Sequence, residues 1–206
     1  FDPDVAKPTT DLLKAGGQIK EFVYDSNKNL HVICRSAITT IDVVNLTELS
    51  NSEFEDWNFN TGRIYNGTLY LIAEYIGTEA DKSTGPYLLK IGVDAAAGAL
   101  SGDIQEVYNF SEIGYSGIKI TAMDVTASGG LYLGTTTNAM LTSTAIEAGV
   151  FEDVFPQILG EHMIYTFKWS NEEYVFINTR NSNDDTKTTI LKLMVFEESA
   201  DDCGRN

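Results

Sequence analysis

One pattern recurs four times along this chain and limits the folds open to it. A polar turn is followed at once by a strand of alternating apolar residues, as in SGGLYLGTT at 128–136. The first strand residues after the four turns are Leu30, Leu69, Leu131 and Tyr174. Asn, Ser, Gly or acidic residues before an alternating apolar run are typical of β-hairpins. We therefore predict an all-β, repetitive fold.

The spacing of these repeats favours one architecture. The gaps between the four positions are 39, 62 and 43 residues, and the long gap contains two insertions, 77–85 and 94–102. Without the insertions the period is about 43 residues, in the range of a four-stranded propeller blade. We predict a β-propeller of about four four-stranded antiparallel blades, either a complete small ring or part of a six- to eight-bladed propeller.

The prediction is of one β-propeller domain over residues 1–206. Its units cover approximately 18–56, 57–115, 116–158 and 159–198, followed by a tail at 199–206. A fourth strand is expected in two units, at 103–110 and 150–158. The last unit has no obvious outer strand, and a segment near 9–13 could supply one and close the ring.

The charge of the chain excludes some partners. It has 14 basic and 30 acidic residues, a net charge of −16. Phosphate backbones and anionic membranes attract clustered Lys and Arg, so we expect no nucleic-acid partner. No apolar run approaches the roughly 18 residues of a membrane span, so we expect no membrane insertion. The acidity indicates a solvated surface or, alternatively, binding of a cation or a basic partner.

The cysteines and histidines do not suggest a nucleophilic site. His31 and Cys34 are three residues apart on one expected strand, so they point to opposite faces. Cys34 shares its face with Leu30 and Val32, which indicates a buried thiol. The alternative is a disulfide from Cys34 to Cys203.

Other polar motifs are interpreted as turns or solvated loops rather than as metal or phosphate sites. DSNKN at 25–29 begins like a calcium loop but lacks its later glycine and acidic ligand. The loop at 181–185 is interpreted as a solvated loop, with a weak cation site as the alternative, and adjacent pairs such as Glu172–Glu173 are interpreted as solvated charge. Gly129–Gly130 precedes a strand rather than a helix, so a hairpin turn is expected and not a phosphate cradle. We therefore expect no catalytic residue, no metal and no cofactor.

The expected binding residues lie on the loops between the second and third strands of each unit. In propellers these loops gather on one face, and loops carry binding residues. The insertion 77–85 would project from the same face. The candidate residues are Arg35, Glu74, Tyr75, Thr136, Asn138, Thr179 and Arg180.

Residues 120–136, ITAMDVTASGGLYLGTT, resemble the propeller repeat found in the sensor regions of two-component regulators. Tyr132 stands where that repeat has Trp, and 25–33 is a poorer copy. The matching residues are Gly130, Leu131, Leu133, Gly134 and Thr135. The resemblance implies an extracytoplasmic module that senses ligands or binds partners, and hence an exported protein, periplasmic, extracellular or on the cell surface.

We therefore expect a non-enzymatic β-propeller module that binds a protein or a small-molecule ligand. The sequence has no Trp-Asp dipeptide and no Ser-x-Asp-x-Gly-x-x-Trp box. It therefore does not support the hypothesis of a WD-repeat protein or of a sialidase. One alternative is a glycan-acting hydrolase or lyase, which needs acidic residues that converge at the central channel. Another is a structural segment of a larger surface or adhesion protein.

Overall fold

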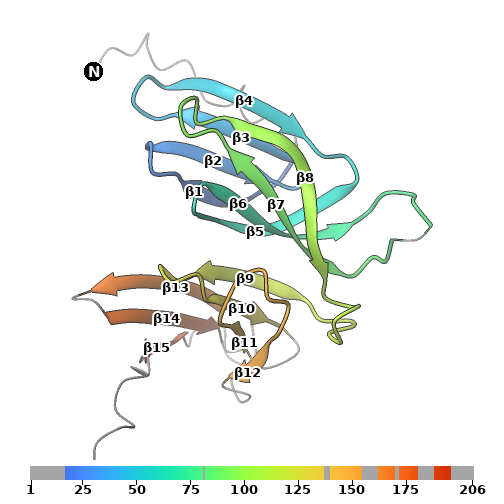
Figure 1. The fold of residues 1–206 in the computed structure, drawn as a ribbon, viewed down its shortest axis with the longest axis vertical. Helices are drawn as coiled ribbons and strands as arrows, with labels where there is room; N and C mark the ends of the chain where they lie inside the picture. Colours follow the sequence, from blue (N-terminus) through green and yellow to red (C-terminus); the bar gives the residue numbers. More distant parts are fainter. Residues whose placement is uncertain are drawn as a thin grey trace, which may run out of the picture.

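A computed structural model gives the chain an all-β architecture (Figure 1). The structure describes residues 17–80, 82–136, 140–154, 162–169, 172–180 and 188–195. Across these ranges the secondary structure is strand and turn, and no described helix is long and apolar enough to cross a membrane. The predicted closing segment near 9–13 and the tail at 199–206 lie outside them.

The first two sheets are four-stranded antiparallel meanders in sequence order. The first blade contains β1 (Ile19–Tyr24), β2 (Asn29–Cys34), β3 (Ala37–Asp42) and β4 (Thr47–Glu53). The second contains β5 (Trp57–Tyr65), β6 (Thr68–Tyr75), β7 (Pro86–Val93) and β8 (Leu100–Asn109). In Figure 1 both lie on one side of the molecule, coloured blue to green.

The third and fourth sheets repeat this topology. The third blade contains β9 (Ile120–Val125), β10 (Leu131–Thr135), β11 (Met140–Ser143) and β12 (Glu152–Val154). The fourth is described as three strands, β13 (His162–Trp169), β14 (Glu172–Arg180) and β15 (Thr188–Val195). Four repeated antiparallel sheets confirm the prediction of an all-β fold built from propeller-type blades.

The third blade contains the glycine-rich stretch at Gly129–Gly130, for which a hairpin turn is expected. Gly129 has a φ of 94°, which a residue with a side chain rarely adopts. The amide of Thr126 donates to the carbonyl of Gly130 at 2.8 Å, and β10 follows immediately. This stretch is therefore a β-hairpin turn.

Two strands differ from the sequence-based expectation. β4 completes the first blade, although residues 47–53 are polar and mostly exposed. An outer strand needs only backbone pairing on one side, so its sequence need not be apolar. β8 begins at Leu100 and therefore takes up the end of the expected insertion 94–102.

The blades stack face to face around their first strands. β1 contacts β5, β5 contacts β9 and β9 contacts β13. A buried apolar cluster lies at each junction: Ile33 and Phe59 belong to the first, and Met140 and Ile164 to the third. Burial of such side chains contributes about 2 kcal/mol each, so these junctions hold the blades together.

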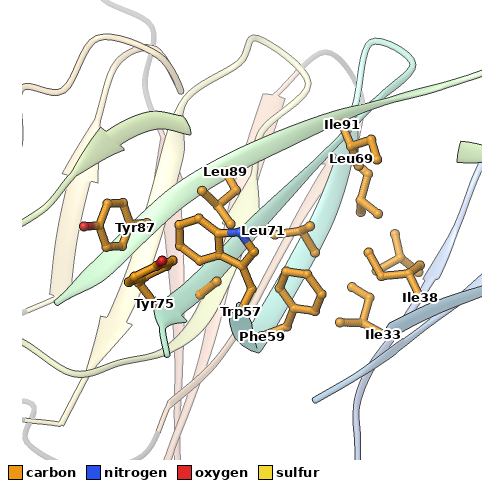
Figure 2. Close-up of a cluster of buried hydrophobic side chains, with 12 residues drawn as sticks. Ile33, Ile38, Trp57, Phe59, Leu69, Leu71, Tyr75, Tyr87, Leu89 and Ile91 are labelled. Carbon is orange, nitrogen blue, oxygen red and sulfur yellow. The ribbon is translucent and has the colours of Figure 1, made fainter. Parts of the chain in front are cut away.

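Figure 2 shows the buried cluster that includes the junction between the first two blades. Ile33 and Ile38 of the first blade face Phe59, Leu69 and Leu71 of the second. A Cβ built on Gly62 of β5 would lie 2.6 Å from Cδ1 of Ile33 and 2.9 Å from the Tyr70 carbonyl oxygen. The absence of a side chain at this glycine therefore allows the close approach of the two sheets.

Candidate binding face and axial charge cluster

The turn after the second strand of a blade and the connector between blades lie at the same end of the molecule. Three backbone hydrogen bonds show this: Phe54 N to Ser36 O at 2.7 Å, Ile76 N to Asp56 O at 2.8 Å, and Thr136 N to Lys119 O at 3.0 Å. We call this end the connector face; it comprises residues 35–36, 54–56, 76–80, 82–85, 110–119 and 136. The geometry brings together segments that are far apart in sequence.

The predicted binding residues occupy this face to different degrees. Arg35 is exposed, and Glu74 and Thr136 are half-buried. Tyr75 is only 3% exposed and belongs to the apolar core. Its ring is therefore part of the support beneath the face.

Two predicted residues are placed by their backbone alone, and a third is not placed. The backbone of Thr179 and Arg180 forms the end of β14, the position equivalent to Tyr75 in β6. Asn138 lies outside the described residues.

The structure describes one of the two cysteines. Cys34 is buried, as the interpretation of a buried thiol predicts, and burial raises the pKa of this thiol. Cys203, the partner in the alternative of a disulfide, lies outside the described residues.

Three aromatic rings support the loop at 76–85. The Trp57 ring packs edge-to-face against Tyr75 and against Tyr87, with centroids 5.2 Å apart in both pairs. Figure 2 shows the three rings side by side at one end of the buried cluster. Such pairs contribute about 1 kcal/mol beyond the burial of their area. The loop after β6 therefore rests on a rigid base.

Hydrogen bonds fasten the loop to that base. The Tyr75 hydroxyl accepts from the Glu79 amide at 3.1 Å, and the Tyr87 hydroxyl donates to the Ser83 carbonyl at 3.1 Å. The Asn109 side-chain amide donates to Ser83 Oγ at 2.9 Å. These three bonds come from strands β6, β7 and β8. A ten-residue loop is thus held at two points.

The loop also places an ammonium group over the aromatic base. Lys82 Nζ lies 5.2 Å from the centroid of the Trp57 ring and 5.1 Å from that of Tyr75. Glu79 Oε2 lies 3.6 Å from the same nitrogen. This arrangement is a cation–π contact with a carboxylate beside it. The rings can therefore hold an alkylammonium group.

The exposed side chains of the connector face are mostly acidic, and they include an apolar one. Ile76 is 48% exposed at the start of the loop. The exposed carboxylates on the face are those of Glu55, Asp56, Glu79 and Glu112. Among the described residues, Arg35 and Lys119 are its exposed basic side chains, because Lys82 is half-buried.

A second cluster lies where the first strands of three blades meet. Arg63 of β5 approaches Glu21 of β1, with NH1 to Oε2 at 3.1 Å, and Asp124 of β9, with Nε to Oδ1 at 3.0 Å. Thr61 Oγ1 donates to the same Glu21 oxygen at 3.1 Å. These groups converge at the axis around which the blades stack. We call them the axial cluster.

The expected hairpin at 25–29 contains a buried polar network. The Asp25 carboxylate accepts from the backbone amides of Asn27 and Asn29, both at 2.8 Å. His31 Nδ1 lies 2.9 Å from Thr40 Oγ1, and its Nε2 lies 3.5 Å from Asp25 Oδ2. His31 and Thr40 are fully buried, so this Asp–His–Thr arrangement supports the blade and is closed to substrate. The described residues contain no cluster of three metal-ligating side chains.

An open pocket of about 300 Å³ lies along the third blade. It is lined by residues of β10, β11 and β12 and of the adjoining turns, including Tyr132, Thr142, Val150 and Glu152. None of the predicted binding residues lines it. We assign it no role.

Sequence reasoning missed Trp57, Tyr87 and Lys82, and it missed the axial cluster. A signal for the first group existed, because aromatic residues flank the insertion 77–85 on both sides. The axial residues gave no signal, because they come from three blades and have no shared motif.

Comparison with known proteins supports the fold alone. No protein-family profile and no curated protein sequence matches the chain. The β-propeller domain of Cps50 (Swd1) from Myceliophteria thermophila is similar in structure, with 12% identity and a TM-score of 0.55 over 90% of this chain and 54% of that one. The computationally designed protein Ika4 has 11% identity and a TM-score of 0.52 over 90% and 96%.

A protein of unknown function from Bacteroides caccae is also similar, with 13% identity and a TM-score of 0.51 over 86% of this chain and 62% of that one. The chain thus spans about half of the fungal domain and under two thirds of the bacterial protein. At these identities the likeness shows a propeller-type fold and transfers no activity.

Proposed function

We propose that this chain is a non-enzymatic β-propeller module of an exported protein and that it binds a partner on its connector face. The observation that carries the proposal is the fastened loop at 76–85. A surface loop of ten residues loses conformational entropy when it is held in one shape. Pre-ordering a loop in this way lowers the later cost of binding. Export is proposed from the resemblance of residues 120–136 to extracytoplasmic sensor repeats.

The chemistry of the face favours a partner with positive charge around an apolar contact. Ile76 supplies an exposed apolar side chain on this face, and Glu55, Asp56 and Glu79 supply exposed carboxylates on the same face. The net charge of −16 adds long-range attraction for a basic partner. Nucleic acid and anionic membrane are disfavoured for the same reason. A basic protein segment fits this face better than an acidic ligand.

The test selects, from a library of random displayed peptides, those that bind the chain. It then measures how tightly these peptides bind variants of the chain. We expect enrichment of Lys- and Arg-rich peptides. Their affinity for the Ile76→Glu variant should be at least tenfold lower, because the apolar contact is lost. Leu46→Glu is the matched control, since Leu46 is also exposed but lies on the turn between β3 and β4, at the opposite end of the first blade. Peptides that bind both variants as well as the wild type would contradict the proposal.

One observation favours a glycan-acting enzyme as a second candidate. Glu21 and Asp124 are acidic residues that converge near the axis, as such an enzyme requires. However, both carboxylates contact the same Arg63 guanidinium, whereas acid–base catalysis needs two carboxyl groups in unequal environments. A screen of chromogenic glycosides with the wild type and Glu21→Gln separates the two functions. Hydrolysis that is lost in the variant would favour the enzyme.

A further inference from the structure

The rings beneath the loop at 76–85 hold the Lys82 ammonium group by its charge alone. Its Nζ lies 5.2 Å from the Trp57 ring centroid and 5.1 Å from that of Tyr75. Glu79 Oε2, at 3.6 Å, is beyond hydrogen-bond distance, and no other group in the described part of the chain accepts a hydrogen bond from this Nζ. The site therefore uses the positive charge of its occupant and none of its N–H groups.

Lys90 shows the opposite arrangement on the same sheet. Its Nζ donates to both carboxylate oxygens of Glu147, at 2.9 and 3.0 Å. The two lysine side chains are similarly exposed, at 32% for Lys82 and 30% for Lys90. An ammonium group with methyl groups in place of its hydrogens could not make the Lys90 contacts, but it could make those of Lys82. Aromatic faces are the surfaces on which proteins bind such quaternary groups.

Two carboxylates favour a cation at this position. Glu79 is one of them, and its side chain is 59% exposed. The second is Glu106 of β8: burial raises the pKa of its carboxyl, and the charge of Lys82 lowers it. Glu106 is thus close enough to interact electrostatically with the ammonium group. Any cation that replaced Lys82 would keep both attractions.

Lys82 can leave the rings without movement of the loop. The backbone is fastened on both sides of it, at the Glu79 amide and at the Ser83 carbonyl. The lysine side chain is a flexible four-carbon stem. A partly exposed cation–π contact and an exposed ion pair are each weak. The ammonium group can therefore turn into solvent while the rings and the backbone stay in place.

We propose that the Trp57 and Tyr75 rings are a binding site for a trimethylammonium group, and that Lys82 occupies this site until the ligand displaces it. A trimethylated lysine side chain of a partner protein and a small free amine such as choline both present this group. The inference goes beyond the basic protein segment proposed above. It rests on the ring pair and holds even if Ile76 takes no part.

The test titrates the chain with the amide of N-acetyl-trimethyllysine, and separately with choline, at constant ionic strength up to about 10 mM, where weak binding saturates. The chain has two tryptophans, so a Trp169→Phe background makes the fluorescence report on Trp57. Broadening of the N-methyl proton signal of each probe gives the same affinities with both tryptophans present. We expect a saturable change in both measurements.

Variants of the resident lysine test the displacement. Lys82→Gln should raise the affinity for both probes by about fivefold or more, because the competing ammonium group is gone. Lys90→Gln is the matched control: it removes an equally exposed ammonium group that contacts neither ring, so the affinity should not change. The unmethylated N-acetyl-lysine amide should bind about fivefold more weakly, because its ammonium group is strongly hydrated and the site offers no hydrogen bond in return.

Circular dichroism checks that the variants keep their strands. The absence of saturable binding to Lys82→Gln would overturn the proposal, as would equal affinity for the methylated and unmethylated lysine probes or an equal gain in Lys90→Gln. Tighter binding of trimethyllysine than of choline would assign the group to a protein side chain, and the reverse to a free amine; both support the site. Peptides that depend on Ile76 could still bind if this proposal failed, so the two proposals fail separately.

Discussion

Arg63 Nε lies 3.0 Å from Asp124 Oδ1, so a charged hydrogen bond ties the first strand of the second blade to that of the third. The same guanidinium contacts Glu21 of the first blade. One side chain therefore joins three blades at the axis. Arg63 and Asp124 are largely shielded from water and Glu21 is partly shielded, which strengthens the attraction between them.

Replacement of Arg63 by Met removes the cation that faces both carboxylates. We expect the free energy of unfolding to fall by about 2 kcal/mol, below the 3–5 kcal/mol of a fully buried pair because Glu21 is partly solvated. Urea unfolding measures this free energy. Lys90→Met is the control: its pair with Glu147 is more exposed, so the expected loss is under about 1 kcal/mol. Equal losses in both variants would contradict a special role of the axial cluster.

His31 should make the stability of the chain depend on pH. Burial lowers its pKa in the folded state, so the unfolded chain binds the proton more readily. The stabilising difference is fully present above pH about 6.5 and is lost as the pH falls below that value. We expect urea midpoints to drop between pH 7 and pH 5 in the wild type and to change less in His31→Gln. An equal drop in the variant would assign the effect to another group.

Gly62 should not tolerate a side chain. Ala at this position would press on Ile33 and on the backbone of Tyr70, so we expect a loss of about 2–3 kcal/mol in the free energy of unfolding. Gly67→Ala is the comparison, because its Cβ would meet no atom within 4 Å and only its φ of 71° is unfavourable. That cost is about 1 kcal/mol. Thermal unfolding would refute the packing argument if the two losses were the same.

Tyr75→Phe tests whether the hydroxyl fastens the loop. It removes the acceptor of the Glu79 amide and leaves the ring in place. We expect that amide to exchange with solvent about fivefold faster, in line with one hydrogen bond of about 1 kcal/mol. Tyr24→Phe is the control at an exposed tyrosine. Unchanged exchange in Tyr75→Phe would show that the loop is held by other contacts.

The blades could be predicted from the sequence because their signals are local. A turn such as that at Gly129 and the alternation of Leu131 and Leu133 involve neighbours along the chain, and the period between repeats reports the size of a blade. The polar strand β4 could not be predicted in this way, because its stability comes from pairing with β3 rather than from its own residues.

The sequence by itself determined the all-β repeat, the hairpin turns and the acidic character of the chain. Only the tertiary structure decided that Tyr75 is buried beneath a fastened loop, that Arg63 meets two carboxylates, and that Phe22 and Tyr24 remain uncovered. The reason is physical: alternation states which residues share a face, but the neighbouring blade decides whether that face meets protein, an opposite charge or water.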